Sequence, residues 1–513
     1  MLNKKKIFKN IFSNWMNFAV NVLISFFLAP FIVHSLGNTY YGIWVILMQF
    51  TGYLYLMDFG IRESIIRYVS KLEAKDDNRE LNEILSTGIL LYGGIGVLSL
   101  FIAILFSFIF PYIFSSPAGD LTDIRIAVVL SGITIMQFLI FNVYMGILMG
   151  LQRYDVYNII GIFAAFIRLG LILYFLGNGY GLVALASIQL IISLGVSIFI
   201  YIFAHRLLKK HNVPFKYIHK PFKERFPIFK KLYNYSVFVL INNLGEKAIF
   251  STDALVIGIF LSAPAVTFYA IAGNLIIYLR KLILMSNSVL NPVASELESK
   301  NDMSGVGQLV LNASRLTMLI ALPVCIVYLS LGEDFIRVWM GLEYTESSPI
   351  VLYILAVSTL LAVPHNTINI ILYGISKHKT VAYLRVLEAI CNLLLSIILV
   401  NYIGIFGVAL GTAIPQIIFM VITLPILVRK HIQFDGYRYI IDVYTKPLIA
   451  GLPFALAGLY ITNYHAAESL FTFFLQLAAI MPVYIISIFI ICLKKDEKEL
   501  LWSLLQRYVP LLR

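Results

Sequence analysis

Long apolar stretches make up most of this chain, and polar positions gather in the short segments between them. Windows of about 19 residues, the usual length for detecting a membrane crossing, pick out about fourteen such stretches. A helix of about 20 residues spans the apolar core of a bilayer, so each stretch is long enough to cross it. The pattern predicts an all-α integral membrane protein with transmembrane helices at residues 10–34, 40–65, 84–112, 124–149, 155–177, 181–204, 234–260, 265–292, 307–331, 349–374, 380–401, 404–428, 446–463 and 469–492.

The loops between the predicted helices alternate in charge. Lysine and arginine are concentrated at both termini and in every second loop, whereas the remaining loops contain only Arg337. Basic loops tend to stay on the cytoplasmic side of a membrane. The alternation therefore predicts that both termini are cytoplasmic. It also supports the number of predicted helices, because one missed helix would disrupt it.

Short similar segments recur in the two halves of the chain at nearly constant spacing. GLQRYDV begins at Gly150 and GISKHKTV at Gly374, while VALAS begins at Val183 and VALGT at Val408. The alternatives are chance similarity among apolar segments and duplication of a six-helix unit, which would give parallel repeats. Duplication predicts a six-helix lobe at 1–204, a basic cytoplasmic linker at 205–233, a second six-helix lobe at 234–430, two additional transmembrane helices at 431–493 and a cytoplasmic amphipathic tail at 494–513.

The composition excludes several other classes of protein. Hydrophobic residues make up 60% of the chain and charged residues 13%, whereas soluble domains have about 45–50% and about 25%. The net charge of +12 could suggest nucleic acid, but its confinement to alternate loops argues against that partner. The three cysteines lie in apolar stretches, so we expect neither disulfides nor a metal site.

The seventh predicted helix carries charges near its centre. Asn242, Glu246 and Asp253 fall within about 40° of one another at about 100° per residue, and Lys247 follows Glu246. Charges at membrane depth cost at least about 2.5–3.5 kcal/mol each and tend to face a cavity or a partner. The stripe predicts a helix that lines a transport cavity. The alternative is a local interaction of Glu246 with Lys247 and a satisfied Asp253 that hold helices together.

Asparagines form a second polar stripe, on the first predicted helix. Asn14, Asn17 and Asn21 lie on one face at helical spacing. Two interpretations remain open for this face. The asparagines line a hydrated cavity, or they form hydrogen bonds between helices, which are worth about 0.6–2 kcal/mol a pair.

The eighth predicted helix carries two cations near the middle of the membrane. Asn274, Tyr278 and Lys281 share a face, and Arg280 lies about 100° from Lys281. The sequence of this helix offers no acidic neighbour. The cations either bind phosphate, for which arginine and lysine are the usual ligands, or form a structural pair with Glu246 or Asp253 of the adjacent helix.

Helical spacing also predicts two ion pairs. Asp58 and Arg62 are i,i+4 neighbours near the cytoplasmic end of the second predicted helix, where a pair either pins the helix end or acts as a gate. Arg385 and Glu388 are i,i+3 neighbours and are expected to pair with each other.

Several motifs resemble a known family. LGNTYYGIW (36–44), GYLYLMDFG (52–60), RESIIRYVSK (62–71) and GLQRYDV (150–156) resemble the Wzx-type O-antigen and polysaccharide flippases. These belong to the multidrug/oligosaccharidyl-lipid/polysaccharide exporter superfamily. The resemblance covers almost the whole chain and is clearest in residues 10–160.

The resemblance implies a transporter that is not an enzyme and needs no cofactor. It implies that an undecaprenyl-diphosphate-linked oligosaccharide moves from the inner to the outer leaflet of the bacterial cytoplasmic membrane, by alternating access between two lobes. It suggests coupling to H+ or Na+, contact with membrane lipids, and cooperation with polysaccharide polymerase and chain-length machinery. The implied cavity cations are Arg62, Lys247, Arg280 and Lys281; Asn14, Asn17, Asn21, Asn242, Asn274 and Tyr278 complete the implied substrate site, and Asp58, Glu246 and Asp253 are the implied coupling or gating carboxylates.

Two rival functions can be weighed from the sequence. A multidrug cation exporter of the same superfamily would want unneutralised acidic residues in its cavity, whereas the first helix here offers only asparagines. A membrane-embedded glycosyltransferase or polymerase usually needs large external loops with catalytic acids. The longest predicted external loop, 332–348, is short, which argues against an enzyme.

Overall fold

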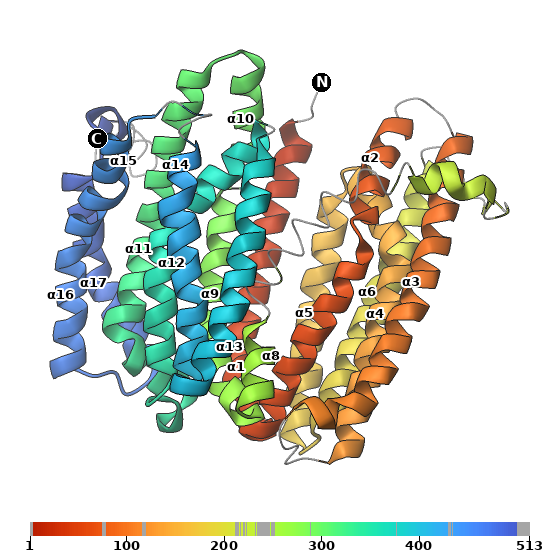
Figure 1. The fold of residues 1–513 in the computed structure, drawn as a ribbon, viewed down its shortest axis with the longest axis horizontal. Helices are drawn as coiled ribbons and strands as arrows, with labels where there is room; N and C mark the ends of the chain where they lie inside the picture. Colours follow the sequence, from red (N-terminus) through yellow and green to blue (C-terminus); the bar gives the residue numbers. More distant parts are fainter. Residues whose placement is uncertain are drawn as a thin grey trace. The chain divides into compact units, whose positions relative to one another are not determined.

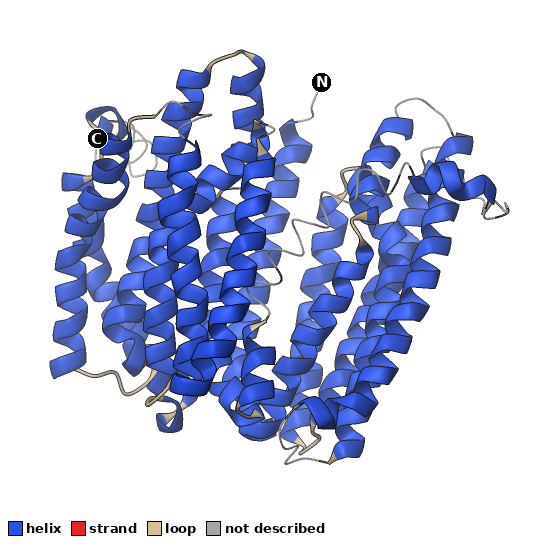
Figure 2. Ribbon diagram, in the orientation of Figure 1, coloured by secondary structure: helices blue, strands red, loops and turns tan. Residues whose placement is uncertain are grey.

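The computed structural model of the protein describes residues 4–73, 78–114, 120–210, 215, 217–218, 221, 223–230, 232, 247, 252–287, 289–375, 377–428, 432 and 434–499. Within these ranges the chain forms α-helices with a few 3-10 and π-helical segments, and it contains no β-strand (Figure 2). The predicted all-α fold is confirmed. Most of the predicted seventh helix, including Asn242 and Glu246, lies outside the described residues.

Eleven helical segments in the described ranges are long and apolar enough to cross a membrane. Two of them, Phe12–Asp58 and Val381–Val428, are 47 and 48 residues long, which is about twice the length that one crossing needs. Each contains two of the helices that the sequence predicts. Counted in this way, the segments account for every predicted helix except 234–260. The protein is therefore a multi-pass membrane protein.

Both long segments are kinked where the sequence predicts a short loop between two helices. α1 (Lys4–Leu54) contains Gly37 with φ 73° and ψ 167°. α13 (His378–Gln416) contains Gly404 with φ 60° and ψ −137°. Glycine lacks a Cβ atom and adopts positive φ at little steric cost. The two glycines thus mark the boundaries between successive crossings.

One predicted helix is interrupted before its end. The sequence predicts a single helix at 40–65, but the structure has a 3-10 turn, η1 (Tyr55–Asp58), followed by a new helix, α2 (Ile61–Glu73). Between them, Phe59 (φ 50°) and Gly60 (φ 72°) both adopt left-handed backbone conformations. A continuous right-handed helix cannot contain such residues, so the residues on the two sides of this break do not share one helix surface.

The chain divides into two compact units, Met1–Thr267 and Phe268–Arg513. In the first unit α4 packs against α2, α3 and α6, and α1 packs against α5. α3 and α4 approach closely, because a Cβ atom on Gly132 would lie only 2.5 Å from the Cβ atom of Ala103. The further helices of this unit are α3 (Asn78–Ile113), α4 (Leu121–Gly150), α5 (Tyr154–Gly177), α6 (Leu182–Lys210) and α8 (Asp253–Phe260) (Figure 1).

In the second unit α11 packs against α12 and α16, α12 packs against α13, and α16 packs against α17. Glycines on α16 face α11: a Cβ atom on Gly458 would lie 2.5 Å from the Ser330 hydroxyl oxygen. The elements besides α13 are α9 (Ala263–Ser286), which begins just before the unit boundary, α10 (Leu290–Ser299), α11 (Met303–Met340), η2 (Leu342–Tyr344), α12 (Ser348–Gly374), η3 (Ile417–Thr423), α14 (Leu424–Val428), α15 (Gly436–Tyr439), η4 (Ile440–Thr445), α16 (Lys446–Tyr464) and α17 (Leu470–Ile491).

Candidate functional site

The asparagines predicted to share a face of the first helix contact α5. Asn17 Nδ2 donates a hydrogen bond to Asn158 Oδ1 at 3.2 Å. Asn158 Nδ2 donates in turn to the Ser13 hydroxyl oxygen at 3.0 Å and to Asn14 Oδ1. Asn158 is buried, whereas Asn14 is exposed. The shared face follows from the 3.6-residue period of α1; its partner on α5 could not be read from that period.

The same contact surface continues along both helices. Asn21 Nδ2 donates to Asn17 Oδ1 at 2.8 Å, and Arg168 Nη2 donates to Asn21 Oδ1 at 3.4 Å. Gly161 permits the close approach, because a Cβ atom there would lie 3.1 Å from Asn17 Oδ1. We call this set, Ser13, Asn14, Asn17, Asn21, Asn158 and Arg168, the α1–α5 seam. It joins two helices through hydrogen bonds, and most of its members remain partly exposed.

Charged residues close one end of the α1–α5 seam. The carboxylate of Asp155, which is buried at the start of α5, lies 2.8 Å from Lys9 Nζ and 2.9 Å from Arg153 Nε. These contacts fix the beginning of α1 against the beginning of α5. The sequence analysis did not identify Lys9 or Asp155, because no local spacing connects them.

Asp58 belongs to a hydrogen-bonded network with α3 and α4. The Tyr92 hydroxyl donates to the Asp58 carboxylate, and Asn142 Nδ2 donates to the Tyr92 hydroxyl oxygen at 3.4 Å. Tyr92 and Asn142 are fully buried. The network therefore ties the end of η1 to the packed centre of the first unit.

Arg62 does not form the predicted helical pair with Asp58. Its Nη2 atom lies 2.8 Å from Glu63 Oε1, the neighbouring residue. The prediction is wrong because the left-handed residues Phe59 and Gly60 place Asp58 and Arg62 in different elements. Burial lowers the pKa of Arg62, but the charges of Glu63 and Asp58 outweigh it and leave that pKa above its usual value. Arg62 is therefore cationic throughout the physiological range.

Lys247 and Asp253 lie against the second half of α1. A Cβ atom on Gly52 would come within 2.6 Å of Lys247 Nζ, and the hydroxyl groups of Tyr53 and Thr252 are 2.6 Å apart. Asp253 is buried and occupies the first turn of α8. One predicted cation and one predicted carboxylate of the seventh helix thus reach the same stretch of α1.

The predicted residues of the eighth helix all lie on α9, in the second unit. Asn274, Tyr278 and Arg280 are half-buried and Lys281 is exposed. α9 is fixed to α11 at this level, because the Tyr328 hydroxyl donates to the backbone oxygen of Leu275 at 3.0 Å. Phosphate binding by Arg280 or Lys281 and their pairing with Glu246 or Asp253 both stay predictions.

α13 carries a row of buried polar side chains. Arg385 Nη1 lies 3.0 Å from Glu388 Oε2, which confirms the predicted pair. Asn392 Nδ2 donates to the Thr412 hydroxyl oxygen at 2.8 Å. Glu388 Oε1, Asn392 Oδ1 and Ser396 Oγ are buried and have no hydrogen-bond partner in the described part of the chain. Their regular spacing of four residues was a sequence signal for one helix face that the analysis above did not use.

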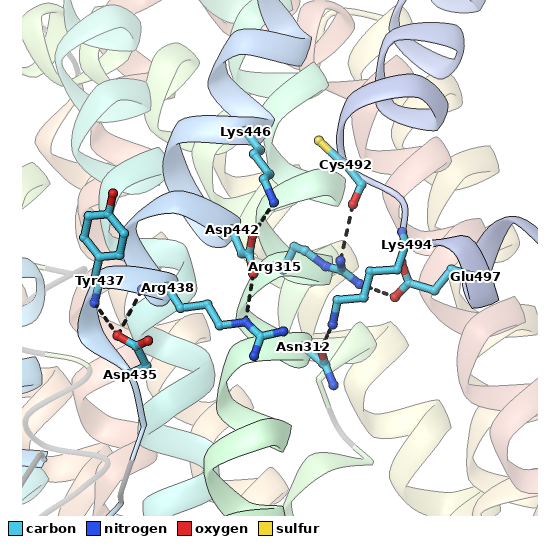
Figure 3. Close-up of polar contacts among 10 residues, drawn as sticks. All are labelled: Asn312, Arg315, Asp435, Tyr437, Arg438, Asp442, Lys446, Cys492, Lys494 and Glu497. Atoms are coloured by element: carbon cyan, nitrogen blue, oxygen red, sulfur yellow. Dashed lines mark hydrogen bonds and ion pairs between the residues drawn. The ribbon is translucent and has the colours of Figure 1, made fainter.

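A charged cluster connects α11 with the segments that precede α16 and follow α17 (Figure 3). The buried guanidinium of Arg315, on α11, contacts the Glu497 carboxylate beyond α17. Asp442 lies 3.3 Å from Arg438 Nε and 2.7 Å from Lys446 Nζ. Both carboxylates have basic partners, so we interpret this cluster as a connection between helices.

Multiple crossings with polar side chains turned toward neighbouring helices define a polytopic α-helical membrane protein. The chain belongs to the polysaccharide biosynthesis protein family, whose model matches residues 36–349.

Individual relatives agree with this family. A putative O-antigen transporter of Shigella flexneri is 23% identical over 419 residues, covering 80% of this chain and 95% of the relative. A probable low-salt glycan biosynthesis flippase, Agl15, of Haloferax volcanii is 28% identical over 192 residues, which are 37% of this chain and 40% of the relative. Among solved structures, the lipid II flippase MurJ in an inward closed conformation matches with a TM-score of 0.65 at 17% identity, covering 93% of this chain and 97% of that one. That structural match shows the fold.

Proposed function

We propose that the protein is a flippase for an undecaprenyl-diphosphate-linked oligosaccharide. It moves this lipid from the inner to the outer leaflet of the bacterial cytoplasmic membrane, for the synthesis of O-antigen, capsule or another surface polysaccharide. Family membership and the names of the O-antigen transporter and the glycan flippase support this substrate class. The protein works by alternating access between six-helix lobes at 1–204 and 234–430, with both termini in the cytoplasm.

The α1–α5 seam is the observation that carries the proposal. A sugar headgroup cannot cross hydrocarbon without groups that replace its hydrogen bonds to water. Asn14, Asn17 and Asn21 offer amides that both donate and accept, and Arg168 adds a guanidinium beside them. Partial exposure leaves these groups accessible while their bonds to α5 hold them in place. Such a strip suits a neutral or anionic glycan better than a hydrophobic cation.

The diphosphate requires cations, which the chain supplies on several elements. Lys281 is exposed on α9, and Arg62 and Lys247 lie on the first unit. Arginine and lysine bind phosphate through charge-assisted hydrogen bonds. We assign the diphosphate to Arg62, Lys247, Arg280 and Lys281, with Asn242, Asn274 and Tyr278 as further substrate contacts. We assign the coupling ion, H+ or Na+, to Asp58, Glu246 and Asp253.

Translocation in proteoliposomes tests the function. Purified protein is reconstituted with fluorescent undecaprenyl-diphosphate oligosaccharide, and its transfer between leaflets is followed by quenching from outside. The wild type should accelerate transfer, and Asn21→Ala, Arg168→Ala and Lys281→Ala should each reduce it at least about tenfold, the effect of 1.4 kcal/mol. Asn401→Ala and Lys300→Ala are matched controls, because both side chains are exposed. Asn401 donates to the Ile397 backbone oxygen within α13, and Lys300 pairs with Glu296 at the end of α10.

Two outcomes would contradict the proposal. If Asn21→Ala, Arg168→Ala and Lys281→Ala all transfer lipid as fast as the wild type, the substrate path does not use these residues. No transfer under any imposed gradient, together with efflux of cationic dyes, would identify a multidrug exporter instead.

A further inference from the structure

The hydrogen-bonded network around Asp58 includes one acceptor without a donor among the described residues, the side-chain oxygen of Asn142. Asn142 Nδ2 donates to the Tyr92 hydroxyl, but Asn142 Oδ1 is buried and accepts no hydrogen bond from any described residue. Asn142 is 1% exposed and Tyr92 is 0% exposed. A buried amide oxygen without a partner destabilises the arrangement that contains it. The network therefore holds an acceptor that a second hydrogen-bonding arrangement can use.

Such an arrangement exists when Asp58 takes up a proton. An ionised carboxylate only accepts, and a phenol has one proton to donate. While Asp58 is ionised, the single Tyr92 proton points to the carboxylate and Asn142 can only donate to Tyr92. Once Asp58 is protonated, its carboxyl donates to the Tyr92 oxygen, and the phenol proton turns to Asn142 Oδ1 after a half-turn of the amide. The direction of the hydrogen bonds reverses, and the amide oxygen and nitrogen of Asn142 exchange places.

The charged and titratable groups around Asp58 allow both states. Arg62, on α2, favours the ionised carboxylate, but its guanidinium is paired with Glu63. Asp58 itself has no ion-pair partner within 4.0 Å among the described residues. Glu63, the partner of Arg62 on α2, repels the ionised Asp58 carboxylate. A carboxylate held away from full contact with a cation can gain or lose its proton without breaking a salt bridge.

We propose that Asp58, Tyr92 and Asn142 form a proton-binding site in which Asp58 takes up one proton from water. The ligand is a proton rather than a metal ion, because Tyr92 and Asn142 are neutral groups whose hydrogen bonds rearrange around a carboxyl proton. The inference deepens the coupling role proposed above for Asp58 and adds Tyr92 and Asn142, which act by positioning and receiving that proton.

The site lies beside the break between η1 and α2, which we call the joint. Proton binding can therefore change how this joint is held. Asp58 is the last residue of η1, and the left-handed Phe59 and Gly60 follow it directly. The strength of the Asp58–Tyr92 bond depends on the charge of Asp58, because hydrogen bonds to an ionised group are roughly twice as strong as neutral ones. Proton uptake therefore loosens the attachment of this joint to α3.

Infrared difference spectroscopy of the full-length protein tests the site without any substrate. Spectra taken across a pH series should contain the carbonyl band of a buried protonated carboxyl group, and Asp58→Asn should remove it. Tyr92→Phe should keep the band but move its midpoint to higher pH by about one unit, since about 1.4 kcal/mol of stabilisation of the ionised form is lost. Asn142→Leu should also move the midpoint, because it removes the acceptor of the reversed bond. Asp120→Asn, an exposed helix cap in the same unit, should change nothing.

A band that persists unchanged in Asp58→Asn would overturn the inference, and so would Tyr92→Phe with an unchanged midpoint. The result is separable from the proposed function. If the band titrates and depends on Asp58 but the protein moves no lipid, the proton site is supported and the flippase function is refuted. If the protein moves lipid but no band depends on Asp58, the flippase function is supported and the proton site is refuted.

Discussion

Lys9, at the beginning of α1, and Asp155, at the beginning of α5, form a 2.8 Å ion pair across 146 residues of sequence. Asp155 is buried and also bound by Arg153 at 2.9 Å, whereas the Lys9 side chain is 63% exposed. The carboxylate is thus the centre of this contact and the lysine its outer member. The pair places the asparagines of α1 in register with Asn158, one turn further along α5.

The two partners should therefore differ in their effect on stability. Asp155→Ala leaves both Lys9 and Arg153 without their acceptor and should lower the free energy of unfolding by about 1–3 kcal/mol. Lys9→Ala should cost less than about 1 kcal/mol, because exposed ion pairs contribute little and Arg153 remains. Thermal unfolding in detergent measures both. Equal losses in the two variants would show that Lys9 contributes as much as Asp155 and that Arg153 does not replace it.

Gly161 tests whether the α1–α5 seam needs its close packing for transport. A Cβ atom there would lie 3.1 Å from Asn17 Oδ1, so Gly161→Ala should push Asn17 away and slow lipid translocation. Gly170→Ala on the same helix is the matched control, because a Cβ atom at Gly170 meets nothing within 4 Å. It should stabilise α5 by up to about 1 kcal/mol through helix propensity and leave transport unchanged. Similar rates of lipid translocation in the two variants would show that the α1–α5 seam is not part of the transport path.

The sequence was sufficient for those parts of the fold that depend on local pattern. Apolar windows located the crossings, and glycines at 37 and 404 sit at kinks where loops were expected. The break at Phe59 and Gly60 was missed, because a phenylalanine with positive φ has no distinguishing sequence pattern. Its conformation is set by the packing of η1 and α2 against α3 and α4 rather than by local preference.

For the candidate site, too, the sequence predicted local features but not contacts between helices. Spacing within one helix predicted the shared face of Asn14, Asn17 and Asn21 and the Arg385–Glu388 pair. Contacts between helices, such as Asn17 with Asn158 or Asp58 with Tyr92, depend on tertiary packing that periodicity does not specify. The seventh helix stays a prediction for Asn242 and Glu246, which lie outside the described residues.

Arg385 and Glu388 should show strong thermodynamic coupling. Glu388 is 0% exposed, so Arg385→Ala leaves a buried charge without its partner and should cost about 3–5 kcal/mol. The double variant Arg385→Ala/Glu388→Ala removes both charges and should be less damaging than Arg385→Ala alone. A double-mutant cycle of unfolding free energies measures the coupling. Additive losses would mean that the two charges are stabilised separately, for instance Arg385 by Asn366, which accepts from it at 2.8 Å.

Asp302, at the start of α11, should give a stability effect that depends on pH. A backbone hydrogen bond from Gly305 and a second bond from the Ser304 hydroxyl lower the pKa of Asp302 below its usual value. A group with a lowered folded-state pKa stabilises the protein above its unfolded pKa of 3.8 and loses that contribution as the pH falls through the folded value. Asp302→Ala should therefore lower the unfolding temperature at neutral pH, and the difference should shrink in acid. A difference independent of pH would show that the cap acts without its charge.

Arg225 should hold part of the predicted linker against the first unit. Its Nη2 atom donates to the Ile218 backbone oxygen at 2.6 Å, and the Ile218 backbone nitrogen donates to the Ser86 hydroxyl on α3 at 3.0 Å. Arg225 is 4% exposed, and Ile228 beyond it packs into the core of the unit. These contacts predict a docked segment rather than a free tether.

Limited proteolysis separates those two states. Arg225→Gln removes the charge and alters the bond to Ile218, so trypsin should cut the lysines of 205–233 at least about tenfold faster, the effect of 1.4 kcal/mol on the opening equilibrium. Lys230→Gln is the control, because Lys230 is exposed and its substitution removes one cleavage site without disturbing the docking contacts. If trypsin cuts the wild type and Arg225→Gln at equal rates, the segment is already free and the bonds of Arg225 do not restrain it.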